Sequence, residues 1–126
     1  MNDQEYRAHC LSLLKRFCER LAGEAALASP EDPLQQLLTG FREIADGTGV
    51  YENGPDLVSR LFASCPHLAP LFPRELLWFL GGECLHFMPD EELAAFQTLE
   101  EKRLAAAAKG EQLDYQQERA KLLKLQ

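Results

Sequence analysis

Apolar side chains recur every three or four residues along most of this chain, which is the spacing that places them on one face of an α-helix. The first helix is predicted over residues 3–28, because Asn2 and Glu5 have the spacing of a capping box at its start. Gly23 is an alternative end for this helix. Its apolar face consists of Tyr6, Cys10, Leu13, Leu14, Phe17 and Leu21.

Prolines and glycines divide the next part of the chain into two helices and a loop. Asp32 as N-cap and Pro33 as first helical residue open a helix that ends at Gly47. A third helix is predicted over residues 55–65. Residues 46–55 between them form the longest polar loop, which we interpret as a surface connection.

A nearly unbroken apolar run occupies the middle of the sequence. Pro73 and Pro89 each fit the first position of a helix, where a missing N–H does no harm. Residues 76–80 are apolar on every side of a helical wheel, and a helix without a polar face is buried. Gly81-Gly82 either ends this central helix or allows another backbone to approach closely. Residues 84–88 should then form a buried connector.

The C-terminal residues 89–126 predict a helix hairpin that is more polar than the rest of the chain. Gly110 occupies a position that favours a left-handed helix end, and Asp114 caps the last helix. The residues predicted to face inward are Leu93, Phe96, Leu99 and Leu104 in the first helix, and Tyr115, Leu122, Leu123 and Leu125 are the apolar residues of the second. We expect the hairpin to project from the core and dock on a second copy or on another protein.

These elements together predict an all-α fold, with about five or six helices packed around the helix at residues 73–80. The 126 residues are enough for one hydrophobic core but not for two. We therefore predict a single helical domain over residues 1–126, with core helices in residues 1–88 and the C-terminal hairpin in residues 89–126.

Composition narrows the classes of function. The formal net charge is −7, and no basic stripe is visible, so direct binding to nucleic acid or to an anionic membrane is not expected. The sequence has no apolar run of 18 residues and begins with acidic rather than basic residues, which predicts a cytoplasmic protein without a signal peptide. The four cysteines show no CxxC spacing and are expected to be reduced core residues.

Chemical motifs are sparse. Cys84, His86 and the nearby Asp90 are the best candidates for a metal or thiol site, since thiolate, imidazole and carboxylate groups bind zinc. However, Cys84 and His86 would point about 200° apart in a helix and could converge only in an extended connector. No phosphate-binding loop, dinucleotide fingerprint, HExxH or GxSxG motif occurs. We therefore predict no catalytic residue and no cofactor.

Residues 77–92, with the sequence LWFLGGECLHFMPDEE, resemble a stretch found in short, uncharacterised all-helical proteobacterial proteins. The resemblance covers mainly residues 71–126. It implies no activity and assigns no catalytic or binding residue.

The function that these features favour is a non-enzymatic, acidic protein–protein interaction module, such as an adaptor, an accessory protein or an inhibitor of a basic partner. The hairpin at residues 89–126 and the loop at residues 47–55 are the predicted contact regions. Tyr51, Trp78 and Tyr115 are the candidate contact residues, because aromatic side chains dominate the energetics of interfaces.

Two alternatives remain open from the sequence. One is a small-ligand or metal-binding protein with a pocket near Trp78, Cys84 and His86, in which neighbouring aromatic residues line the cavity. The other is a purely structural homodimer.

Overall fold

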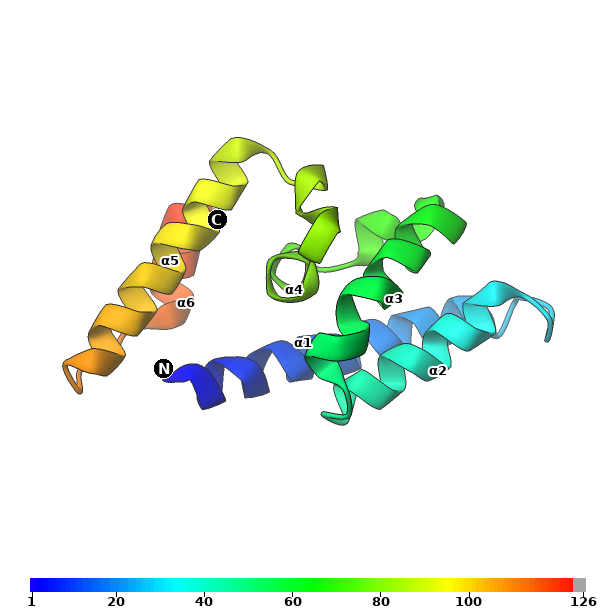
Figure 1. Ribbon diagram of the computed structural model, residues 1–126, viewed down its shortest axis with the longest axis horizontal. Helices are drawn as coiled ribbons and strands as arrows, with labels where there is room; N and C mark the ends of the chain where they lie inside the picture. The colour runs from blue at the N-terminus through cyan, green and yellow to red at the C-terminus, as the bar shows by residue number, and fades with distance from the viewer. Residues whose placement is uncertain (124–126) are drawn as a thin grey trace. The chain divides into compact units, whose positions relative to one another are not determined.

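The computed structural model describes residues 1–123, with Glu83 described only through its backbone, and it confirms the all-α fold. These residues form helices and no β-strand. In chain order the helices shown in Figure 1 are α1 (Asp3–Ala25), α2 (Pro33–Ala45), α3 (Val50–Ser64), the 3-10 helix η1 (Pro66–Leu71), α4 (Arg74–Leu80), the 3-10 helix η2 (Gly82–Phe87), α5 (Asp90–Ala108) and α6 (Tyr115–Leu122). None of the helices among the described residues combines the length and apolar character needed to cross a bilayer.

Contacts gather the chain into two compact units. The central unit is Cys10–Leu85, and the terminal unit comprises residues 1–9 together with residues 86–123. Helix α1 contributes its first residues to the terminal unit and the remainder to the central unit. Lys124 and Leu125, which the sequence pattern assigned to the last helix, lie outside the described residues.

The helix starts follow the capping residues that the sequence predicted. The Asn2 side chain accepts a hydrogen bond from the Glu5 backbone N–H at 2.8 Å, and the Glu5 carboxylate accepts one from the Asn2 N–H at 3.3 Å. The carboxylate of Asp32 accepts from the N–H of Leu34 at 2.9 Å, and that of Asp114 accepts from the N–H of Gln117. Side-chain caps of this kind satisfy backbone donors that the first helical turn leaves without partners.

Helix α1 ends three residues earlier than predicted, at Ala25 instead of Ala28. The next residues form a turn in which the N–H of Leu27 donates to the carbonyl of Glu24, and the N–H of Ala28 donates to the carbonyl of Ala25. These bonds span three residues and so tighten the last turn. Gly23 lies within the helix and does not end it.

A cluster of edge-to-face phenylalanines forms the core of the central unit. The ring of Phe72 lies 4.9 Å from that of Phe17 and 6.2 Å from that of Phe62, and Phe17 and Phe41 are 5.4 Å apart. Because Phe17, Phe41 and Phe62 come from α1, α2 and α3, the Phe72 ring holds three helices together. Helices α2 and α3 approach closely where Gly40 lies against Leu57, since a Cβ at Gly40 would be 2.6 Å from the Leu57 side chain.

Helix α4 begins at Arg74 and α5 at Asp90, so Pro73 and Pro89 are N-caps and not the first helical residues that the sequence predicted. Helix α4 buries Leu76, Leu77 and Leu80 as predicted, but Trp78 and Phe79 are only half-buried. Gly81-Gly82 ends this helix, which is one of the two roles that the sequence left open. Gly82 has a φ of 47°, which ends the helix, and a Cβ at Gly81 would collide with the backbone carbonyl of Leu77.

Helix α3 begins at Val50, five residues before the predicted start at Pro55, so much of the predicted polar loop is helical. The sequence prediction was wrong here because it took Gly54 as a loop residue and Pro55 as the start of the helix. Instead, Val50 is buried, and Gly54 lies so close to Leu80 that a Cβ there would be 2.7 Å from its side chain. Packing of this first turn outweighs the low helix propensity of glycine and proline.

In the terminal unit, α5 buries Phe96, Leu99, Arg103 and Ala106. Leu104, predicted to face inward, is 45% exposed, because the buried row advances by three or four residues and takes position 103 instead. The connector at residues 84–88 is also only partly as predicted. Its ends, Cys84 and Met88, are buried, whereas the ring of Phe87 is 51% exposed.

Candidate interaction surface

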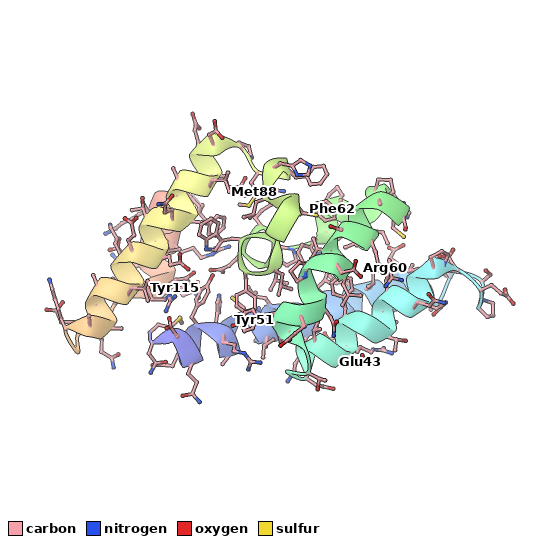
Figure 2. The ribbon with its side chains drawn as sticks, viewed as in Figure 1. Glu43, Tyr51, Arg60, Phe62, Met88 and Tyr115 are labelled. Atoms are coloured by element: carbon pink, nitrogen blue, oxygen red, sulfur yellow. The ribbon has the colours of Figure 1, made fainter. Side chains whose placement is uncertain are left out.

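Tyr51 is a large aromatic side chain left open to solvent at the start of α3. It is 60% exposed, and its ring packs edge-on against Phe79 at a centroid distance of 5.7 Å. The turn before it is set by Gly49, the N-cap of α3, whose φ of 62° suits glycine. Figure 2 shows Tyr51 at the end of α3 where this helix begins. The exposed ring is therefore held in place by a neighbouring aromatic residue.

Carboxylates accompany Tyr51 on the first turns of α3. Glu52 and Asp56 are both exposed and lie one helical turn apart. Asp56 forms an ion pair with Arg60 at 3.8 Å, in which both side chains are largely solvated. Such exposed pairs contribute about 0–1 kcal/mol. The α3 surface, defined here as Tyr51, Glu52 and Asp56, thus combines an aromatic anchor with negative charge.

A second surface feature lies along the outer seam of α1 and α2. Two shallow hollows of about 540 and 560 Å³ adjoin there and share Ala22 and Arg42 in their linings. The remaining lining residues are Ala25, Ala26, Ala28, Pro30, Gln35 and Leu38 in the first hollow, and Lys15, Cys18, Glu19, Ala45 and Asp46 in the second. Small side chains therefore form much of this seam.

The only thiol on the seam is Cys18. Burial raises its pKa to about 11, and Arg42 opposes this rise while Asp46 and Glu19 add to it. A thiol with such a pKa stays protonated near neutral pH, and the thiolate is the nucleophilic form. Cys18 is therefore a packing residue in this surface. The four cysteines are free and buried.

The other two aromatic candidates are less accessible than Tyr51. Trp78 is half-buried in α4. Tyr115 is only 4% exposed, and its ring lies 5.7 Å from that of Tyr6 and 5.6 Å from that of His9. Tyr115 therefore belongs to the core of the terminal unit.

Cys84, His86 and Asp90 differ in their surroundings. Cys84 is 3% exposed, and its Sγ lies 3.3 Å from the hydroxyl of Ser59. His86 is exposed and its ring stacks on Phe87 at 4.2 Å, while Asp90 is exposed in the first turn of α5. Within the described part of the chain, no three histidine, cysteine, aspartate or glutamate side chains gather in a way that could hold a metal ion.

Two buried charged residues were not predicted from the sequence, Glu75 in α4 and Arg103 in α5. The Arg103 guanidinium donates a hydrogen bond to the carboxylate of Asp3 at 2.8 Å and lies 4.5 Å from the ring centre of Tyr6. Arg103 lies on the same face of α5 as Phe96 and Leu99, so helical spacing alone could have predicted that position 103 is buried. Nothing in the pattern around Glu75 indicated that it is buried.

The model of the PA2817-like family matches residues 2–126, and the chain belongs to that family. Neither a curated protein nor a solved structure matches the chain.

Proposed function

We propose that this member of the PA2817-like family is a non-enzymatic interaction module that binds a basic segment of another protein through the α3 surface. The observation that carries the proposal is the exposure of Tyr51. A tyrosine ring that is 60% exposed and fixed by an edge-on neighbour is ready to bury apolar area without much further ordering.

The charge of this surface supports a basic partner. Glu52 directly follows Tyr51 in the chain and Asp56 lies one turn after Glu52, and the whole chain carries a formal net charge of −7. Charge of one sign around a contact residue speeds association with the opposite charge and disfavours partners of like charge. An adaptor, an accessory protein or an inhibitor of a basic partner would each use such a surface.

Affinity capture from a native lysate, with the full chain as bait, tests this proposal. We expect a stoichiometric basic protein that is lost when the bait carries Tyr51→Ala, and whose binding weakens as salt is raised. The partner should then be purified and titrated calorimetrically against both baits. A Tyr51→Ala bait should bind at least about tenfold more weakly, as for an aromatic interface anchor.

The control is Leu104→Ala, which removes an exposed apolar side chain of similar accessibility from α5. It also tests the hairpin of residues 89–126 that the sequence suggested as a contact region. Loss of the partner with Leu104→Ala but not with Tyr51→Ala would assign the contact to α5 and contradict the proposed surface. An acidic partner would contradict the charge argument.

The proposal also places the protein in the cytoplasm. Its four thiols are free and buried, as expected for a chain that folds in a reducing compartment. No step of the proposed activity requires a cofactor or a metal ion. The ligand-pocket alternative would instead be supported by a thermal shift with a metal ion that disappears in His86→Ala.

A further inference from the structure

The seam of α1 and α2 in the central unit is a two-helix groove with charge at one end. The helices run antiparallel, because Phe17 packs on Phe41 while the Gln35 side chain donates to the carbonyl of Ala25 at 2.7 Å. Figure 1 shows α2 running alongside α1. Each hollow along this seam is therefore lined by one row of side chains from α1 and one row from α2.

Four charged side chains alternate in sign at the end of the groove away from the α1–α2 turn. Lys15 and Glu19 lie one turn apart on α1, and Arg42 and Asp46 lie one turn apart on α2. Since the helices are antiparallel, Lys15 is level with Asp46, and Glu19 is level with Arg42. All four are exposed, and none forms an ion pair or hydrogen bond through its side chain with another of the described residues.

We propose that a second copy of this chain docks on the groove, related by a two-fold axis that runs parallel to α1 and α2 within the interface. This rotation lays α1 of each copy over α2 of the other. Lys15 then faces Asp46 of the second copy, and Glu19 faces Arg42 of the second copy. Every charge of the quartet meets an opposite charge, as an isologous interface requires.

The end of the groove near the α1–α2 turn, called the alanine end below, favours the same axis. It is lined by four alanines, Pro30 and Leu38 together with the polar Gln35 and Arg42, and the neighbouring Leu27 is 88% exposed, more than any other large apolar side chain of the described residues. An axis parallel to the helices places this end over its own counterpart, so that Leu27 can bury against small residues of the other copy. An axis across the helices would also pair the charges but would leave both alanine ends uncovered.

The charge balance selects a second copy over other occupants. With a net charge of −7, two chains repel each other over most of their surface. The groove is an exception, because its two bases and two acids sum to zero. Small side chains at its centre, Cys18, Ala22 and Ala45, allow the backbones of two helix pairs to approach closely.

Analytical ultracentrifugation of the full chain at increasing concentration tests the proposal. We expect a shift from 14.2 kDa to twice that mass. Lys15→Glu should weaken association about tenfold to a hundredfold, because it places two carboxylate pairs face to face across the axis. Lys109→Glu makes the same change in net charge on the exposed end of α5 and should leave the dimer unchanged.

Two double variants with the net charge of the natural chain identify the axis. Lys15→Glu with Asp46→Lys should restore the dimer, because it exchanges residues that face each other across the proposed axis. Lys15→Glu with Glu19→Lys should not restore it, because like charges would then meet at all four positions. The reverse result would overturn the proposed arrangement.

The alanine end is tested by Leu27→Ser, which should also weaken the dimer, with Leu104→Ser as the control on α5. All of these residues are exposed, so circular dichroism should show unchanged helix content. A chain that stays monomeric at every concentration would overturn the proposal. A dimer whose dissociation constant is changed by neither Lys15→Glu nor Leu27→Ser would also overturn it. Neither result bears on the binding of a basic partner at Tyr51.

Discussion

The central and terminal units are both helical, but different forces hold them together. The central unit is built around buried phenylalanines, with Phe72 touching rings from three helices. In the terminal unit, the buried Arg103 of α5 forms an ion pair with Asp3 of α1. Lys102 of α5 forms a second ion pair, with Glu118 of α6. The central unit should therefore respond mainly to changes in volume, and the terminal unit to changes in charge.

The largest expected effect is that of Phe72→Ala in the central unit. Removing the ring leaves a cavity where Phe17, Phe41 and Phe62 meet, and truncations of buried aromatic residues cost about 3–5 kcal/mol. Urea unfolding followed by circular dichroism measures the loss. Phe87→Ala, at a ring that is 51% exposed, is the matched control and should change the free energy of unfolding far less. Equal losses would show that the aromatic cluster has no special role.

The titration of Cys18 should add a charge effect to the central unit in alkaline solution. Burial raises the pKa of Cys18 to about 11, whereas an unfolded thiol titrates near about 8.5. The unfolded chain therefore loses this proton first, and the associated stability is fully present below about pH 8.5 and falls as pH rises towards 11. The loss should amount to roughly 3 kcal/mol.

Comparison with Cys18→Ala isolates this effect. The variant starts less stable because of the small cavity, but its free energy of unfolding should fall less steeply between about pH 8.5 and 11. Urea melts at several pH values measure both slopes. Parallel slopes for the two proteins would contradict a raised pKa at Cys18.

In the terminal unit, Asp3→Ala should cost more than Arg103→Met. Asp3→Ala leaves the buried guanidinium with the Tyr6 ring but without its carboxylate, at a cost of about 1–2 kcal/mol, since Asp3 itself is 82% exposed. Arg103→Met keeps most of the buried stem and removes the charge, while Asp3 stays solvated. Amide hydrogen exchange in α5 measures the local stability.

The double variant sharpens this test. Once Arg103 is methionine, Asp3→Ala should have little further effect, because the buried charge that it would leave without a carboxylate is gone. If the two single changes simply add, the ion pair does not couple Asp3 to Arg103, and the contrast between the units weakens.

The parts of the fold that depend on local sequence were predictable, and those that depend on tertiary contact were not. Capping residues such as Asn2 and Asp114 act within one helical turn, and the sequence identified them correctly. The start of α3 was missed because Val50 and Gly54 are helical only through packing, Gly54 against Leu80. Arg103 was missed because a charged head with a long apolar stem does not look like a core residue.

The candidate surface shows the same division. Tyr51 and Tyr115 were both candidates because their side chains are aromatic, but only the structure separates the exposed ring from the buried one. The seam at Cys18 gave no signal in the sequence, because its hollows form between two helices and its residues are ordinary members of each. Trp78 was also a candidate because its side chain is aromatic, yet it is half-buried in α4.

The smallest expected effect concerns the contact of α6 with α5. Lys102 Nζ donates to Glu118 Oε2 at 3.0 Å, and this hydrogen bond lowers the pKa of Glu118. A carboxylate with a lowered pKa stabilises the folded state above its unfolded pKa of about 4.3, and this stability is lost as pH falls through the folded pKa. Amides of α6 should therefore exchange faster in acid, and high salt should produce part of the same change near neutral pH.

Glu118→Gln should remove most of the dependence on pH, whereas Phe72→Ala should leave it unchanged because that ring packs within the central unit. If α6 protection instead stays constant down to about pH 3, the ion pair does not hold α6 to α5, and apolar contacts of α6 must supply the attachment.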